Sequence, residues 1–105
     1  MITVKFFTEG RIYSGFEFSG HSGLAPAGED ILCASVSSAV ILTANTITDF
    51  FKIPSRVTQR DGYLKLVLLK KDPDSAQKLI ESLAYQMKTL SSDYPGEIKI
   101  KIRRK

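Results

Sequence analysis

The residues best suited to chemistry are the only histidine and the only cysteine of the chain, His21 and Cys33, twelve positions apart. A thiolate is a strong nucleophile, and a neighbouring imidazole is a common acceptor of the thiol proton. The pair therefore suggests a sulfur nucleophile, Cys33, with His21 as general base and then general acid. A single cysteine forms no internal disulfide, and the chain has too few His and Cys for a structural zinc site. We expect no cofactor and no metal.

The segment between the two reactive residues is rich in glycine and alanine. Small residues let the backbone fold closely over a site and move when a substrate enters. Three glycines are the expected flexible positions of this loop: Gly20, Gly23 and Gly28. Asp30 is a good N-cap residue, and a helix that begins there would hold Cys33 in its first turn. Unpaired N–H groups and the helix dipole favour a thiolate at that position. The amides of Leu32 and Cys33 would then serve as an oxyanion hole.

Two further polar residues are candidates for supporting roles. Asp30 either caps the helix only or orients His21 as the third member of a triad-like set. Ser37 follows Cys33 by one turn on the same helix face, so its hydroxyl is a candidate hydrogen-bond partner of the sulfur or of a substrate oxygen. Such a serine more often bonds back to its own helix.

Non-catalytic interpretations of the same residues remain open at this point. A lone cysteine early in an apolar helix is usually a small buried side chain, and a lone histidine near a loop is usually a surface residue. The four residues 20–23, Gly-His-Ser-Gly, match the G-x-x-G of KH-type RNA-binding modules. That motif belongs between two helices, however, whereas here it follows an expected strand.

Hydrophobic alternation predicts five strands and two helices in the order ββα-ββα-β. Residues 2–7 and 12–19 form a first hairpin, in which Ile12, Phe16 and Phe18 are expected on one face. A second hairpin, 57–69, turns at Asp-Gly, and a last strand carries the alternating residues 98–103. This order predicts an α+β two-layer sandwich, with a mostly antiparallel sheet and both helices on one face.

The first helix is expected from residue 31 to about residue 51, central and packed nearly all round. Its apolar positions are Leu32, Val36, Ala39, Val40, Thr43, Ile47, Phe50 and Phe51. The second helix is expected to open at Asp72-Pro73 and to stop at Tyr94-Pro95-Gly96.

Length and composition indicate one compact domain spanning residues 1–105. The longest apolar tract is interrupted by Ser, Thr, Asn and Asp, so we expect no membrane span. A net charge of +4, with Lys99, Lys101 and Arg103 on one strand, permits contact with RNA without establishing it. A reducing cytoplasm is the expected location.

The stretch that carries His21 and Cys33 contains Gly20-His21-Ser22-Gly23, Ala25, Gly28, Asp30-Ile31-Leu32-Cys33-Ala34 and Ser35-Val36-Ser37. Together these residues resemble the signature of the ribosomal-processing cysteine protease family Prp. The resemblance covers essentially the whole chain. It implies a cytoplasmic, homodimeric cysteine protease that removes the N-terminal extension of a large-subunit ribosomal protein. His21 and Cys33 fall on the family's catalytic pair, and Asp30 and Ser37 fall on supporting positions. The alternative is a non-catalytic ribosome-associated or RNA-binding module.

Overall fold

The computed structural model describes residues 1–20, 27–70 and 74–104, and the side chains of 27–30 lie outside that description. Its elements follow the expected order. They are β1 (Ile2–Glu9), β2 (Ile12–Ser19), α1 (Ala27–Asn45), the π-helical turn η1 (Thr46–Phe50), β3 (Ser55–Arg60), β4 (Tyr63–Leu68), α2 (Asp74–Asp93) and β5 (Ile98–Arg104). Both expected hairpins are present, and their turns contain Gly10 and Gly62 with φ of +63° and +70°.

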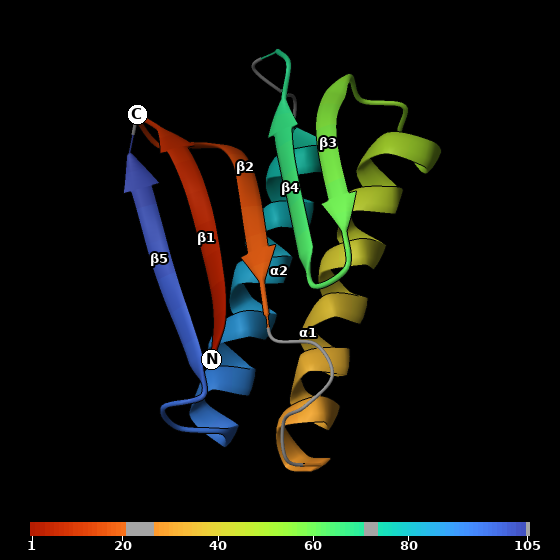
Figure 1. The fold of residues 1–105 in the computed structure, drawn as a ribbon. Helices are drawn as coiled ribbons and strands as arrows, with labels where there is room; N and C mark the ends of the chain where they lie inside the picture. Colours follow the sequence, from red (N-terminus) through yellow and green to blue (C-terminus); the bar gives the residue numbers. More distant parts are fainter. Residues whose placement is uncertain (21–26, 71–73, 105) are drawn as a thin grey trace.

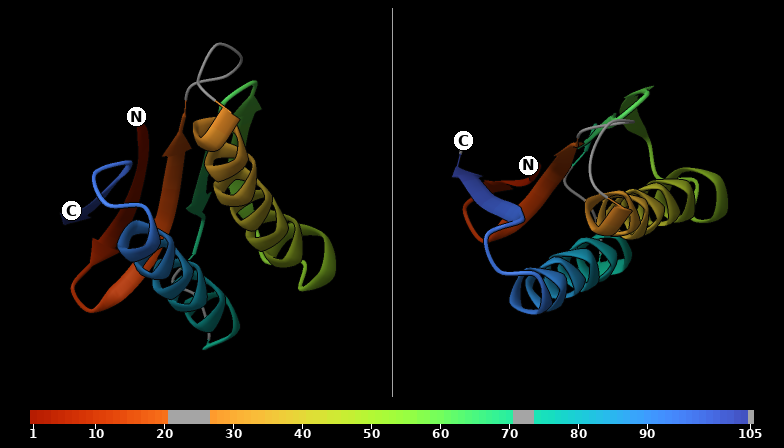
Figure 2. Two further views of the ribbon diagram at one scale, coloured as in Figure 1. Left: turned by 90° about the horizontal axis from the view of Figure 1, so that it is seen from below. Right: turned by 60° about the horizontal axis from the view of Figure 1, so that its bottom comes forward.

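The five strands form one mixed sheet in the order β3-β4-β2-β1-β5. Four neighbouring strands pair antiparallel, whereas β5 pairs parallel to β1 at the edge. Both helices lie on one face of the sheet, where α2 packs against β2 and β5 and α1 packs against β4 (Figures 1 and 2). This arrangement confirms the expected α+β fold of two layers.

The core lies between the sheet and the helices because alternate strand residues point toward α1 and α2. The buried strand residues of the core cluster are Ile2, Val4, Phe6, Phe16, Phe18, Leu64, Leu66, Leu68 and Ile98. The helices contribute Leu32, Val36, Val40, Ala44, Ala76, Ile80, Leu83, Ala84 and Met87, together with Ile47 from η1. The second helix therefore turns one apolar side toward the core.

One prediction within the first hairpin is wrong. The register of β1 and β2 shifts between Phe7 and Thr8, so that Thr8 pairs with Tyr13. The extra residue reverses the alternation. Tyr13, rather than Ile12, therefore points toward the helices, where its ring meets Phe6 edge-on at 6.1 Å. The Gln77 side chain on α2 exchanges two 2.8 Å hydrogen bonds with the Tyr13 backbone. Ile12 is left 37% exposed.

The first helix departs from expectation at its start. It begins at Ala27, so Asp30 lies inside the helix and is not its N-cap, and Gly28 is helical. Cys33 is therefore the seventh residue of α1, in the second turn. An α-helix leaves only its first four N–H groups without intrahelical partners. The amides of Leu32 and Cys33 thus donate within the helix, contrary to the expected oxyanion hole.

The same helix is packed on one side only, contrary to the expectation of a central helix. Ile31 and Leu42, eleven residues or three turns apart, are 62% and 67% exposed. The segment Ile31–Phe50 is long and apolar enough to cross a membrane by length and composition alone, and 28% of it is buried. In this fold its other side completes the core, as expected of a globular protein's helix.

The far end of α1 continues into η1, which also differs from the predicted pattern. The amide of Phe51 donates to the carbonyl of Thr46 at 3.0 Å, a five-residue π-helical step. Such a step rotates the residues that follow relative to the preceding α-helical face. Phe50 and Phe51, expected on the apolar face, are 78% and 53% exposed for this reason.

Candidate active site

Cys33 lies where the second turn of α1 meets the end of β2. Its side chain is half-buried and packs against the core cluster. A Cβ added to Gly20, the residue after β2, would lie 3.2 Å from Cys33 Sγ and 3.1 Å from the Phe18 ring. The backbone of Gly20 therefore passes directly beside the sulfur. A larger residue at position 20 would crowd the thiol.

The β3–β4 turn holds Gly20 in this position. The Gly20 amide donates a 3.0 Å hydrogen bond to the carbonyl oxygen of Gly62. In the reverse direction, a Cβ added to Gly62 would lie 2.8 Å from the Gly20 oxygen, closer than real Cβ contacts come. Gly62 also has a φ of +70°, which glycine adopts with least strain. Both the backbone angle and the close approach therefore require glycine at position 62.

Three elements that are distant in sequence thus meet at the thiol. They are the end of β2, the β3–β4 turn and the second turn of α1, which lie at the same end of the molecule (Figure 1). His21 and Gly23 lie outside the described residues. Asp30 and Gly28 are described only as helical backbone of α1. Of the predicted site residues, the structure brings Gly20 and Cys33 together.

The hydroxyl of Ser37 donates to the carbonyl oxygen of Ala34 at 3.4 Å. Ser35 similarly donates to the carbonyl oxygen of Ile31 at 3.0 Å. These bonds to the helix's own carbonyls satisfy the hydroxyls along α1. Ser37 is half-exposed one turn beyond Cys33, so its place on the expected helix face agrees with the sequence pattern.

Three polar side chains interact on the strands next to the contact between Gly20 and Gly62. Tyr63, which follows Gly62, donates a 2.5 Å hydrogen bond to Glu17, and the Arg60 guanidinium stacks 3.9 Å from the Tyr63 ring centre. The bond to Glu17, followed by burial, raises the pKa of Tyr63 above its ordinary value of 10.0. The phenol therefore keeps its proton at neutral pH. Among the described residues, no cluster of three or more His, Cys, Asp or Glu is arranged to hold a metal ion.

Sequence reasoning missed the contribution of Gly62. The Asp-Gly turn itself was predicted, but its position beside Gly20 depends on the pairing of β2 with β4. These strands are not neighbours in the sequence, so no local pattern connects the turn to Cys33. Only the strand order reveals the contact.

Comparison with known proteins identifies similar chains over nearly the full length. A family model described as cysteine protease Prp matches residues 1–99. The ribosomal processing cysteine protease Prp of Bacillus subtilis (strain 168) is 28% identical over 91 residues, covering 81% of each chain.

Solved structures match the fold closely. The crystal structure of a Streptococcus mutans protein has a TM-score of 0.81 at 24% identity and covers 100% of this chain and 96% of its own. The essential ribosomal processing protease Prp from S. aureus, solved with a covalently linked product peptide, has a TM-score of 0.85 at 21% identity. That match covers 98% of this chain and 100% of the other. At these identities the solved structures establish a shared fold.

Proposed function

Because the chain belongs to the cysteine protease Prp family, we propose that it removes the N-terminal extension of a large-subunit ribosomal protein, with Cys33 and His21 as its catalytic pair. One observation carries the assignment of the pair. The backbone of Gly20, which directly precedes His21 in the sequence, lies against Cys33 Sγ. The chain therefore reaches the sulfur one residue before the histidine.

The proposed reaction proceeds in two steps. His21 takes the thiol proton, Cys33 Sγ attacks the scissile carbonyl carbon, and the imidazolium returns the proton to the leaving amine as a thioester forms. His21 then removes a proton from water, whose oxygen attacks the thioester. The C–S bond of the thioester then breaks, the carboxylic acid product leaves, and the imidazolium returns its proton to sulfur, which regenerates the Cys33 thiol. The chemistry needs no cofactor.

The second-turn position of Cys33 makes the histidine more important. The helix dipole acts mainly within the first turn of a helix, so its effect on a thiol in the second turn is reduced. Thiolate formation at Cys33 then depends mainly on proton transfer to the His21 imidazole. Asp30 is proposed to orient His21, since the start of α1 at Ala27 leaves it no capping role. Ser37 is a proposed supporting residue one turn beyond the nucleophile.

Glycines at positions 20 and 23 are proposed to let the substrate peptide enter, whereas Gly28 belongs to α1. The close packing around Gly20 supports this role at that position, because the peptide backbone must approach a sulfur that Gly20 already flanks. The substrate by this proposal is the N-terminal extension peptide. The S. aureus relative is described in complex with a substrate peptide.

A homodimer in the cytoplasm completes the proposal. Ile31 and Leu42 form an exposed apolar stripe on the side of α1 that faces away from the core. A second copy packed on this stripe would remove both side chains from water. Light scattering should therefore give twice the mass of the 105-residue chain. The variant Leu42→Glu should shift that mass toward the monomer.

Family membership favours the protease over the non-catalytic ribosome-associated or RNA-binding module. A ribosomal RNA contact through Lys99, Lys101 and Arg103 is compatible with catalysis, because β5 lies at the edge of the sheet and Cys33 on a helix.

Cleavage of a synthetic extension peptide from the organism's own ribosomal protein tests the proposed function. Mass spectrometry of the products should show one cut with the unmodified protein. Cys33→Ala and His21→Ala should each abolish it while circular dichroism stays unchanged. Cleavage at the normal rate by either variant would refute the catalytic pair.

A further inference from the structure

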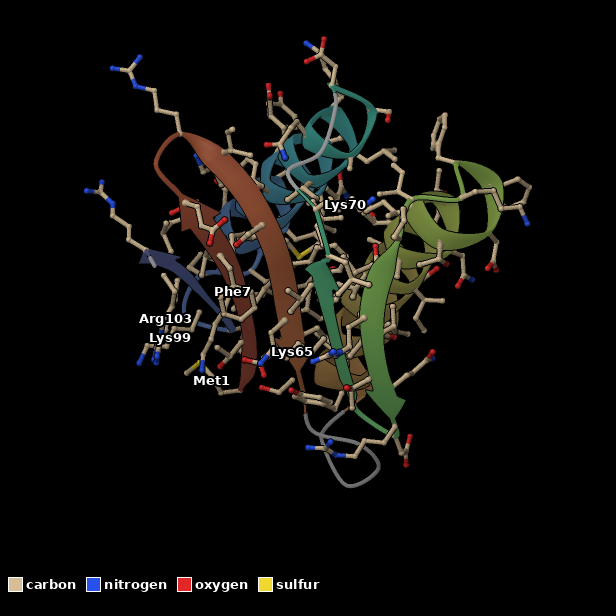
Figure 3. All side chains as sticks on the ribbon, turned by 90° about the horizontal axis from the view of Figure 1, so that it is seen from above. Met1, Phe7, Lys65, Lys70, Lys99 and Arg103 are labelled. Atoms are coloured by element: carbon tan, nitrogen blue, oxygen red, sulfur yellow. The ribbon has the colours of Figure 1, made fainter. Side chains whose placement is uncertain are left out.

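The face of the sheet that α1 and α2 leave open is organised in three rows across all five strands. The first row is Lys99, Thr3, Ser19, Tyr63 and Arg60, the second is Lys101, Lys5, Glu17, Lys65 and Thr58, and the third is Arg103, Phe7, Gly15, Val67 and Arg56. We call these fifteen residues the basic face. Figure 3 shows Lys65, Lys99 and Arg103 on the side of the sheet away from the helices.

The basic face holds the entire positive excess of the chain. Seven of its residues are Lys or Arg, and one is acidic. The whole sequence contains 15 Lys and Arg and 11 Asp and Glu, which leaves eight basic and ten acidic residues elsewhere. The face therefore carries a formal charge of +6 and the rest of the chain −2, against a total of +4. Such a one-sided distribution produces a strong field on one surface.

The single carboxylate on this face has both oxygens occupied. Lys5 Nζ lies 3.6 Å from one oxygen of Glu17, and the Tyr63 hydroxyl donates to the other at 2.5 Å. Glu17 is thus held by its neighbours and repels an approaching anion less. The cations at both edges of the sheet, on β5 and β3, stand about 19 Å apart at ordinary strand spacing.

The aromatic rings of this face are covered by cations. Phe7 is 7% exposed, and Lys65 Nζ lies 5.5 Å from its ring centre. The Arg60 guanidinium stacks on Tyr63. Proteins that bind single-stranded nucleic acid use exposed rings on which bases stack. These rings are not available for stacking, so the face suits a phosphate backbone instead of bases.

We propose that the basic face binds the phosphate backbone of double-stranded RNA without sequence preference. A depression of about 320 Å³ lined by Arg56, Thr58, Lys65, Val67 and Leu69 gives phosphate oxygens a recess next to two cations. Side-chain cations and hydroxyls on a broad face are typical partners of an RNA duplex, which proteins recognise by shape and backbone.

An anionic membrane is a less suitable partner. Peripheral membrane binding combines cations with apolar side chains that enter the lipid. None of the fifteen residues of the basic face belongs to the strongly exposed large hydrophobics, which lie mainly on α1, η1 and element ends. The face offers charge without an apolar anchor.

The proposed surface ends beside the candidate active site. Two residues of its first row adjoin the site in sequence. Ser19 directly precedes Gly20, and Tyr63 directly follows Gly62. RNA bound to the face would therefore hold a ribosome-associated substrate near Cys33. The choice of RNA as the polyanion rests on the proposed ribosomal substrate. The charge distribution of the face is independent of that proposal.

Fluorescence anisotropy with a labelled 24-base-pair RNA duplex of mixed sequence tests the proposal. If about five cations contact phosphates, the logarithm of the binding constant should fall with the logarithm of salt concentration with a slope of about −4.5. Between 50 and 200 mM salt the affinity should then drop about 500-fold. The variant K99E/R103E should reduce the slope by about 2 and weaken binding more than about tenfold at the lower salt.

K78E/K88E is the matched control, because both lysines are exposed on α2 and the change in net charge is identical. It should bind RNA nearly as the unmodified protein does. Equal losses in the two variants, absence of RNA binding, or tighter binding to phosphatidylserine vesicles than to the duplex would overturn the proposal. Cleavage of the isolated extension peptide, measured in parallel, distinguishes this failure from failure of the proposed protease function.

Discussion

Replacing Gly62 with alanine should damage the candidate site more than an ordinary change in a hairpin turn. At a φ of +70°, alanine carries a backbone penalty of about 1 kcal/mol. Its Cβ would also lie 2.8 Å from the Gly20 oxygen, and backbone atoms relieve such a contact only by moving. Overpacking adds about 1–3 kcal/mol, so the free energy of unfolding should fall by about 2–4 kcal/mol.

Gly10→Ala is the matched control for the backbone angle. Gly10 lies in the β1–β2 turn with a φ of +63°, and a Cβ there would meet nothing within 4 Å. Urea unfolding should therefore show a loss of only about 1 kcal/mol. Peptide cleavage, measured where both variants are folded, should fall about tenfold or more in Gly62→Ala because Gly20 is displaced beside the sulfur. In Gly10→Ala it should be unchanged.

Equal losses of stability in the two variants would refute the reasoning, since they would mean that the contact with Gly20 costs nothing. Normal cleavage by a folded Gly62→Ala would refute the link between the β3–β4 turn and the nucleophile.

Three further outcomes follow from the described contacts. Gly20→Ala places a Cβ 3.2 Å from Cys33 Sγ, so iodoacetamide should alkylate Cys33 several-fold more slowly while unfolding in urea shows a loss of about 1–3 kcal/mol; unchanged alkylation would contradict the contact. Tyr63 has a raised pKa, so the folded protein holds the phenol proton more tightly than the unfolded chain. The resulting stability is present below about pH 10 and is lost as pH rises through the folded-state pKa. Melting temperatures should be measured for both proteins between about pH 8 and 11, and that of Tyr63→Phe should fall less toward pH 11 than that of the unmodified protein. Parallel plots of melting temperature against pH for the two proteins would contradict this. Ile80 on α2 is fully buried, so Ile80→Ala should cost about 2–5 kcal/mol in urea unfolding, whereas the exposed-site change Lys78→Ala should cost less than about 0.5 kcal/mol.

Local patterns predicted the elements well where a single period or a specific turn determines them. The Asp-Gly pair fixed the second hairpin, and the alternation of Ile98 and Ile100 with lysines identified β5. The parallel pairing of β5 with β1 had no such signal, because it joins the two ends of the described chain.

Errors arose where one residue changes the geometry of a regular element. The register shift in the first hairpin exchanges the faces of Ile12 and Tyr13, although both side chains fit a strand. The π-helical step in η1 similarly exposes Phe50. Asp30 is a favourable N-cap residue, but helix formation begins three residues earlier at Ala27. Propensity thus identified these elements without fixing their exact ends.

The candidate site was predictable in its chemistry and not in its surroundings. The uniqueness of His21 and Cys33 drew attention to them, and the residue types define what they would do. The supporting contact of Gly20 with Gly62 depends on strand pairing across about 40 positions of sequence, a tertiary property that residue type does not encode locally.

The pH dependence of Cys33 alkylation, with and without His21, tests the central claim most directly. Cys33 is the only cysteine, so the mass gained with iodoacetamide reports on that sulfur alone. We expect rapid alkylation of the unmodified protein at about pH 7, where an ordinary thiol is largely protonated. In His21→Ala the rate at that pH should fall to that of a model thiol. Superimposable profiles for the two proteins would contradict activation of Cys33 by His21.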